Sequence, residues 1–424
     1  MVFIPFMEDQ MERSEVKIWS LLHAPTGPIA IYIDAIARDL LEQGFTRRSI
    51  APQVRLIAKF SGWLETNAIT LTSLSDEHVG VFMRAVERPQ SKRIGDRPCL
   101  QRLMCFLRSS NLIQQPAINN SVDASAIQQA MFNYGASLLK DQALSRSTCA
   151  QYISFAEHFL SERFGSGVLN FDELRAADVV EFIRRQASRY SPARAKSATI
   201  ALRSFLRYLR MRGAVSLNLA AAVPTVPNWS MTGIPRAISQ DHVEAVLASC
   251  RRDTAVGCRD YAILLLLSRL GLRSSEIVAL TLDSIDWEQG SLAVVGSKGG
   301  QRSELPLPAD VGSAIVEYLQ RGRPRSACRS LFLRVNAPIA GLGSQTSIGS
   351  IVVAAIARAG IHPPHAGAHQ FRHALACQLL RQGASLTEIG SLLRHQHQKT
   401  TSIYAKVDFT ALRSISLAWP GSAQ

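Results

Sequence analysis

The sequence contains no Cys-x-x-Cys pair, although seven cysteines are scattered between Cys99 and Cys377. An odd number of scattered cysteines does not make a disulfide framework, so we expect reduced thiols that are mostly buried as small apolar groups. This usage is typical of a protein in a reducing compartment, and we predict a cytoplasmic location. The N-terminal residues also lack a basic segment followed by a long apolar run, so we expect no secretory signal peptide.

Long apolar runs are missing as well. The most apolar stretch, YAILLLLSRLGL, begins at Tyr261 and is interrupted by Arg269, well short of the length that spans a bilayer. We therefore predict a core helix at this position and no membrane partner. The 424 residues, 47% of them hydrophobic, are enough for two or three globular domains with cores of their own.

Acidic residues are in short supply. Asp and Glu number 33 against 47 Lys and Arg, which gives a formal net charge of +14 at pH 7. A protein of this size could carry such an excess as an ordinary basic surface. The excess nevertheless favours a polyanionic partner, which is most often nucleic acid.

The second of two similar helical segments has nine basic residues from Arg184 to Arg212 and no acidic residue among them. At helical spacing Arg203, Arg207 and Arg210 share one face, and Leu202 with other apolar residues forms the opposite face. Charged helix faces are usually just solvated, but they normally mix both signs. A single-sign stripe repels itself unless phosphates neutralise it. We predict contacts with the DNA backbone from Arg184, Arg185, Arg194, Lys196, Arg203, Arg207 and Arg210.

Most of the chain carries helical periodicity, interrupted by two polar segments. The segment at 223–239 contains three prolines and a glycine, which cannot continue a helix, and the segment at 113–125 is a second break. We therefore predict an N-terminal tail at 1–25, a helical domain at 26–112, a second helical domain at 126–226, a linker at 227–235 and a C-terminal domain at 236–424.

The two predicted helical domains resemble each other in sequence. Similar residues recur in the same order from Asp39 and from Ser137 onward, including Arg48 with Arg146 and, further along, Phe82 with Phe182 and Leu103 with Leu202. This order suggests a duplicated unit of four or five helices. The alternative is that any two amphipathic helical bundles share such spacing.

The sequence changes character after the linker. Ser239 is placed to cap a helix, and SLAVVG and SELPLP are strand-like runs joined by SKGGQR, whose glycines suit a tight reversal. Helical patterns then resume to the end of the chain. The predicted fold class is mainly α, with helical domains followed by a mixed α+β domain that carries a small antiparallel sheet.

Six of the ten histidines fall between residues 362 and 397. A helix that starts near His369 places His369 and Arg372 on one face, because they lie three residues apart. The sequence SLTE at 385–388 is a capping box that opens the next helix, and a final helix is expected to bear Tyr404.

A metal site is one explanation for these histidines. His365, His369 and His373 are spaced four apart, but two prolines and Gly367 make a continuous helix from His365 improbable. The stretch also has no His-Glu-x-x-His pattern and no cysteine at ligand spacing. We therefore predict no metal here.

These residues, taken together with two upstream segments, resemble the tyrosine recombinase (phage integrase) family. The segments are GLRSSEIVALTLDSID with Arg273 and VVGSKGGQRSELPLP with Lys298, followed by His-x-x-Arg at 369–372 and a nine-residue step from His395 to Tyr404. Singly, each has an ordinary structural explanation, such as a turn lysine or a core histidine. Their joint order and spacing are specific for the family.

The resemblance covers residues 238–407 and implies a set of catalytic roles. Tyr404 would be the nucleophile, and Arg273 and Arg372 would grip the scissile phosphate. Lys298 would act as general acid, and His369 and His395 would assist. The resemblance also makes Glu276 a structural partner of Arg273. The family's Leu-Leu-Gly-His is Leu-Leu-Arg-His here, so Arg394 stands where a glycine is usual.

These residue types suit displacement at a phosphodiester. Arginines hold the nonbridging oxygens with permanently charged donors, so two of them can act without a metal ion. A free tyrosine has a pKa near ~10 and needs a base or nearby cations to become a nucleophile. A covalent 3′-phosphotyrosine would keep the energy of the broken bond, so neither ATP nor another cofactor is expected.

The resemblance implies a site-specific DNA recombinase, of the integrase or transposase kind, whose helical domains bind DNA and whose C-terminal domain is catalytic. The expected partners are double-stranded DNA with a specific recombination site and, on that DNA, three further copies in a homotetramer. Related recombinases are further candidate partners. The extra helical domain favours a mobile-element enzyme. Two alternatives stay open: a DNA-binding accessory protein with a decayed active site, and a type IB-like topoisomerase.

Overall fold

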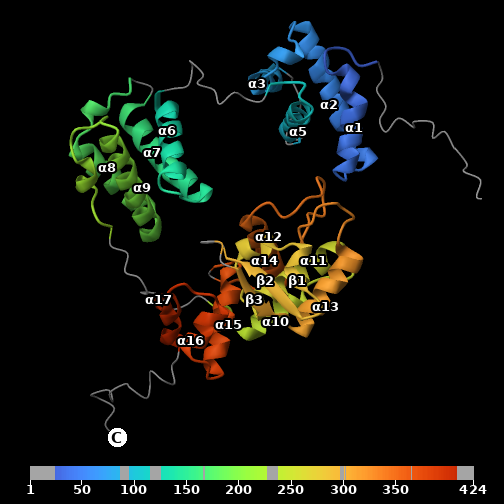
Figure 1. Ribbon diagram of the computed structural model, residues 1–424, viewed down its shortest axis with the longest axis vertical. Coiled ribbons are helices and arrows are strands. Elements are labelled where there is room, and N and C mark those ends of the chain that lie inside the picture. The colour runs from blue at the N-terminus through green and yellow to red at the C-terminus, as the bar shows by residue number, and fades with distance from the viewer. Residues whose placement is uncertain are drawn as a thin grey trace, which may run out of the picture. The chain divides into compact units, whose positions relative to one another are not determined.

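The computed structural model describes residues 24–85, 95–114, 126–165, 168–226, 237–296, 300, 302–363 and 365–407. Nearly all of the predicted tail, the linker at 227–235 and Lys298 lie outside the described residues. Figure 1 shows three groups of elements, which are described here one at a time. No helix among the described residues is long and apolar enough to cross a membrane.

The described residues of the N-terminal bundle form four α-helices and two 3₁₀ turns. Its apolar faces enclose a core that includes Ile33, Phe60 and Leu103. Helix α2 begins after Thr46, whose hydroxyl accepts a hydrogen bond from the Ser49 N–H. The elements are η1 (Ala30–Tyr32), α1 (Ile33–Glu42), α2 (Arg47–Thr66), η2 (Leu71–Ser73), α3 (Asp76–Ala85) and α5 (Asp96–Ser109).

Among the described residues, the middle bundle shares the order of two helices, a 3₁₀ turn and two helices, but its other 3₁₀ turn follows the last helix and does not precede the first. Helix α7 also begins after a hydroxyl cap, Ser145, and both bundles place a 3₁₀ turn between their second and third helices. This shared order is what a duplicated unit would give, and the duplication remains our prediction. The elements are α6 (Ala126–Lys140), α7 (Arg146–Phe164), η3 (Phe171–Glu173), α8 (Ala176–Arg189), α9 (Pro192–Met211) and η4 (Leu219–Ala222).

The apolar face predicted around Leu202 is buried in the middle bundle. Leu202, Phe205, Leu206 and Leu209 are each at most 3% exposed, whereas Arg207 and Arg210 on the other side of α9 are exposed. The core holds this helix in place and leaves its basic side accessible.

The C-terminal domain is helical, with a small sheet at one side (Figure 1). Its first half contains α10 (Gln240–Ala248), α11 (Ala255–Arg269), α12 (Ser274–Ala279), η5 (Leu282–Ser284), β1 (Ile285–Asp286), β2 (Ser291–Val295) and β3 (Arg302–Pro306). Its second half contains α13 (Ala309–Glu317), the π-helical turn η6 (Tyr318–Gly322), α14 (Gln345–Arg358), α15 (His369–Arg381), α16 (Leu386–Leu392), α17 (Gln398–Thr401) and η7 (Ser402–Val407).

The strands form an antiparallel sheet in the order β1-β2-β3. Strands β2 and β3 are the two predicted strand-like runs, and their register pairs Ser291 with Pro306 and Val295 with Arg302. The mainly helical fold with a small antiparallel sheet confirms the predicted fold class. Ser239 caps α10 through the His242 N–H, as its position in the sequence predicts.

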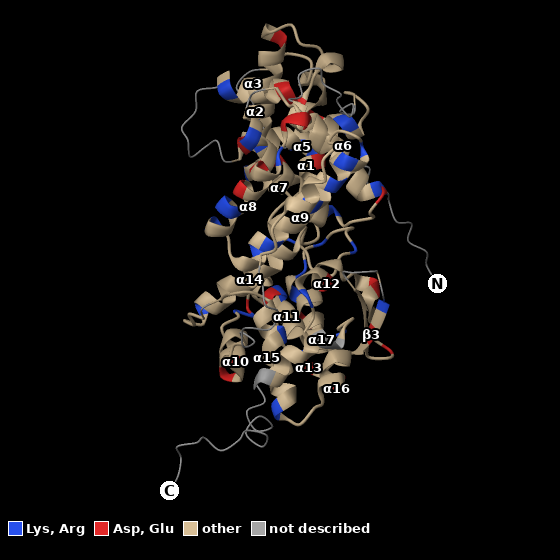
Figure 2. Cartoon of the chain, turned by 90° about the vertical axis from the view of Figure 1, so that its left-hand side faces the viewer, with Lys and Arg blue, Asp and Glu red and all other residues tan. Residues whose placement is uncertain are grey.

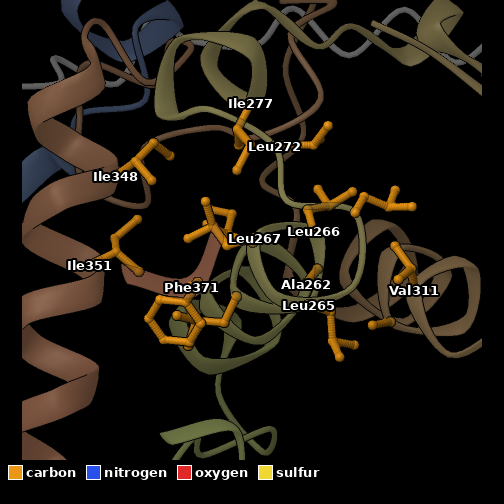
Figure 3. Packing of buried hydrophobic residues seen from close by; sticks show 14 of the residues in the cluster. Ala262, Leu265, Leu266, Leu267, Leu272, Ile277, Val311, Ile348, Ile351 and Phe371 are labelled. Atoms are coloured by element: carbon orange, nitrogen blue, oxygen red, sulfur yellow. The ribbon is translucent and has the colours of Figure 1, made fainter. Parts of the chain in front are cut away.

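Helix α11 is the centre of the C-terminal core. The run from Ala262 to Leu267 is at most 1% exposed, because its side chains meet other helices on every side. Figure 3 shows Leu267 on the side that faces Ile351, and Leu265 and Leu266 on the side that faces Val311. This confirms the predicted core helix, and it provides a rigid base for the segment from Leu270 to Ser274.

Candidate active site

Arg372 is a deeply buried charged side chain of the C-terminal domain, at 1% exposure. It lies in the first turn of α15, and its guanidinium donates to the carbonyls of Gly271 and Leu393. Gly271 has a φ of +57°, and a Cβ there would come within 2.8 Å of Leu393 Cδ2. A glycine is therefore needed for the turn that aims this carbonyl at Arg372.

Glu276 lies beneath the site and joins two other arginines. One carboxylate oxygen accepts from Arg273 Nη1 at 2.7 Å, and the other accepts from Arg394 Nη2 at 2.9 Å and from the Arg273 N–H at 2.9 Å. Burial opposes ionisation of Glu276, but the backbone N–H of Arg273 and the two guanidiniums hold the pKa of this carboxyl below its usual value.

Arg273 and Arg394 thus share one carboxylate. With the guanidinium of Arg372 beside them, the pocket holds two positive charges in excess. Among the described residues, no carboxylate forms an ion pair with Arg372. Burial lowers the pKa of Arg372 to about 9, and the charges of Arg273 and Arg394 act in the same direction. Uncompensated buried charge is costly, so the pocket is electrostatically suited to an anion.

The loop after α16 presents backbone carbonyls to two of these arginines. The His395 N–H donates to the Gly390 carbonyl and the Arg394 N–H to the Ser391 carbonyl, which is the Schellman pattern of helix termination. The Leu393 carbonyl is then free to accept from Arg372, and the Arg394 carbonyl lies 3.4 Å from Arg273 Nη2.

Arg394 occupies the left-handed position of this loop, with a φ of +54°. Glycine is the usual residue at such a position, because a side chain there costs about 1–2 kcal/mol. The side chain of Arg394 turns back into the site and reaches Glu276, so the guanidinium gains a buried ion pair where the family's glycine would have none.

Tyr404 is 1% exposed and lies on the 3₁₀ turn η7. We expected a final helix to bear it, but α17 ends at Thr401 and continues as this tighter turn, a common way for a short helix to end. Burial raises the pKa of the Tyr404 phenol to about 12, although the charge of Arg372 acts to lower it. The resting phenol is therefore protonated at neutral pH.

Three histidines surround the phenol. His373 Nδ1 lies 2.9 Å from Tyr404 Oη, and the His395 ring is nearly parallel to the Tyr404 ring at 6.5 Å. The His369 ring packs edge-on against His373, with 4.6 Å between centroids. Burial, followed by the neighbouring charges, lowers the pKa of His373 and of His395 to about 4, and desolvation with Arg372 and Arg273 also lowers the pKa of His369.

Five of the six predicted catalytic residues therefore gather in one pocket, and Lys298 lies outside the described residues. The hairpin that carries Lys298 nevertheless borders the site, because Ser303 of β3 lines a cavity of about 600 Å³ together with Arg394 and His395. No group of three or more His, Cys, Asp or Glu suited to a metal ion occurs in the part of the chain that the structure describes.

Sequence reasoning missed two functional features of the pocket. His373 was considered only as a metal ligand, although its place four residues after His369 already put it on the same helical face. The pairing of Arg394 with Glu276 joins residues 118 positions apart and had no local signal.

The residues predicted to bind DNA occupy different environments in the middle bundle. Arg184 is paired with Glu181, and Arg185 with both Glu181 and Glu162. Arg194 stacks over Tyr190 at 4.7 Å. In the cartoon of Figure 2, Lys and Arg positions are spread over helices of all three groups.

The basic stripe of α9 lines a hollow of about 760 Å³. Arg203 donates to the carbonyls of Val223 and Pro224, so it also holds the segment after η4. Arg207 and Arg210 line the same hollow and are exposed, as is Lys196. Among the predicted residues, Arg207 and Arg210 are the best placed to meet a phosphate backbone.

Known proteins resemble this chain along most of its length. Residues 236–411 match the model of the phage integrase family. The chain is 49% identical over 406 residues to the putative integrase/recombinase y4rA of Sinorhizobium fredii, which covers 96% of this chain and 98% of that protein. It is 30% identical to the tyrosine recombinase XerD of Listeria monocytogenes, over 66% of this chain and 94% of that protein.

A solved structure supports the fold. XerH site-specific recombinase, in a post-cleavage complex with palindromic difH substrate, matches with a TM-score of 0.53 and 19% identity over 74% of this chain and 92% of that chain. The family model and the sequence relatives define the class of protein, the tyrosine-type DNA strand transferases. The chain belongs to the phage integrase family of tyrosine recombinases, and it is a site-specific recombinase of this class.

Proposed function

We propose that Tyr404 cleaves one DNA strand and holds it as a 3′-phosphotyrosine, with Arg273 and Arg372 binding the scissile phosphate. The observation that carries this proposal is the excess of guanidiniums over carboxylates in a pocket that also contains a buried phenol. A phosphodiester supplies the missing negative charge. The charge that develops on its nonbridging oxygens is stabilised most strongly by donors that are already in place.

The chemical step balances without a cofactor. The bond from Tyr404 Oη to phosphorus forms while the bond from phosphorus to the 5′-oxygen breaks. The phenol gives up its proton, and the departing 5′-oxygen takes one from Lys298, which we propose as the general acid. In rejoining, a 5′-hydroxyl attacks the phosphotyrosine and restores a phosphodiester, so no ATP is consumed.

We further propose that the chain acts on double-stranded DNA with a specific recombination site, as a homotetramer that brings two sites together. The basic face of α9 supports a backbone contact, because Arg207 and Arg210 are exposed on one side of a well-packed helix. Phosphate contacts of this kind make binding weaken steeply with salt.

Covalent trapping on nicked duplexes tests the proposal. The nick lets the cleaved fragment diffuse away, so a pool of nicked duplexes with randomised sequence should yield an adduct that survives denaturation. Tyr404→Phe should form no adduct, and the control Tyr261→Phe, from the same domain, should behave as the wild type. An adduct that persists in Tyr404→Phe would refute the proposed nucleophile, and a wild-type chain without adduct would favour the accessory-protein alternative.

A further inference from the structure

His373 makes the hydrogen bond that Tyr404 Oη shows in the structure. Its Nδ1 lies 2.9 Å from the phenolic oxygen, and the two rings meet at 64° with 5.5 Å between centroids. The contact bridges 31 residues of sequence, from the second turn of α15 to η7. A buried phenol normally donates its proton to a partner, and a neutral imidazole accepts at one nitrogen while it keeps a proton on the other.

We propose that His373 is the catalytic base of this recombinase: it accepts the Tyr404 hydroxyl proton through Nδ1 as the phenolic oxygen attacks phosphorus. This inference rests on the proposed function of Tyr404 and names the group that receives its proton. Nothing in the sequence pattern assigned this role, since the residues carried over from the family at the site were His369 and His395.

The other two histidines are engaged differently. His395 Nδ1 is 2.7 Å from Thr401 Oγ1, and its ring stacks alongside that of Tyr404, not end-on to the hydroxyl. The His369 ring contacts His373 edge-on, and within the described residues no hydrogen bond joins it to Tyr404. Of the three rings, only that of His373 has a nitrogen within hydrogen-bonding distance of the phenolic oxygen in the structure.

The charges around His373 explain how the base is kept inactive until DNA arrives. On its own helix it faces His369 and Arg372, and from the neighbouring elements it faces Tyr404 and His395. Burial lowers the pKa of His373 to about 4, with further lowering by His369 and Arg372, while the pKa of Tyr404 is about 12. Proton transfer from the phenol to the imidazole is therefore strongly disfavoured in the resting site.

A bound phosphodiester changes this balance. Its negative charge offsets that of Arg372, which acts on both partners, and it favours the protonated form of His373. Attack on phosphorus also removes the need for a free phenolate, because the proton leaves while the new bond forms. In rejoining, the protonated His373 returns the proton to the phenolic oxygen, so the cycle leaves the histidine unchanged.

Single-turnover cleavage by the full chain tests the inference, with nicked duplexes enriched from the randomised pool as the probe. His373→Asn keeps a neutral polar group near the position of Nδ1 but cannot take up a proton. We expect its cleavage rate to fall by roughly 10²-fold, the low end of what a general base contributes. The affinity for the same DNA should stay within about twofold, since the phosphate-binding arginines are untouched.

The pH profile separates a base from a residue that only positions Tyr404. The wild-type rate should rise with pH below neutrality, and this rise should be lost in His373→Asn. His373→Ala should recover activity when imidazole is added, which also shows that the variant is folded. His362→Asn, an exposed histidine ahead of α15, is the matched control and should follow the wild type.

The experiment distinguishes failure of the proposed function from failure of the role of His373. A wild-type chain that forms no adduct overturns the proposed function and this inference together. A wild-type adduct with His373→Asn at an unchanged rate and pH profile overturns the role of His373 alone. A faster His373→Asn enzyme would also overturn it, because the hydrogen bond would then be a restraint on Tyr404.

Discussion

The arginines of the C-terminal pocket and those of the middle bundle carry the same charge in opposite environments. Arg372 is buried, donates to two carbonyls and, among the described residues, forms no ion pair, because the nearby carboxylate of Glu276 is paired with Arg273 and Arg394. Arg184, the first of the nine basic residues predicted to form a single-sign stretch, lies exposed beside Glu181. The comparison teaches that an anion site is marked by charge that is buried and uncompensated, more than by the number of basic residues.

The largest effect should come from the pocket. Arg372→Lys keeps the positive charge but loses the planar group that donates to two carbonyls and to phosphate at once. We expect covalent cleavage of nicked duplexes to fall by about 10²–10³-fold, the usual cost of one transition-state donor. Arg329→Lys, an exposed arginine paired with Asp283, is the control and should retain wild-type cleavage. A comparable loss of cleavage in Arg372→Lys and Arg329→Lys would mean that burial in the pocket does not set Arg372 apart from an exposed arginine.

A smaller effect is expected in the middle bundle. Arg207→Ala should weaken DNA binding and lower the slope of log affinity against log salt by about 0.9, because one phosphate contact is lost. Arg184→Ala should change the slope less, since Glu181 already compensates its charge. Binding titrations at several salt concentrations measure both slopes. If Arg184→Ala lowers the salt slope more than Arg207→Ala does, the ion pair with Glu181 does not keep Arg184 from contacting DNA.

The smallest effect concerns Arg394. Arg394→Gly and Arg394→Ala both remove the ion pair with Glu276, but only alanine keeps a Cβ at a φ of +54°. The glycine variant should therefore be more stable than the alanine variant by about 1 kcal/mol in urea unfolding. Equal stability would mean that the loop changes conformation when the guanidinium is removed.

Local signals explain what could be predicted from the sequence. The start of α15 at His369, the capping box at Ser385 and the β2–β3 hairpin follow from helical spacing, a hydroxyl cap and turn glycines, each within a few residues. The core helix around Leu265 follows from its unbroken apolar run. Such features depend on neighbouring residues, so a single sequence contains them.

Contacts between distant segments explain what could not be predicted. The bond between His373 and Tyr404 and the pair between Arg394 and Glu276 depend on how helices pack, and their partners lie 31 and 118 residues apart. The pairing of Arg184 with Glu181 is different, because the two lie three residues apart on one helix. The sequence therefore does indicate that Glu181 neutralises the charge of Arg184, once the residues just before Arg184 are considered with the basic stretch.

The central claim is that one phosphodiester sits among three guanidiniums within reach of the Tyr404 phenol. Peptide mapping of the trapped protein–DNA adduct by mass spectrometry tests it most directly. The account predicts a single linkage, from the 3′-phosphate of the cleaved strand to the peptide that contains Tyr404. A linkage at another residue, or through the 5′ end of the strand, would contradict it.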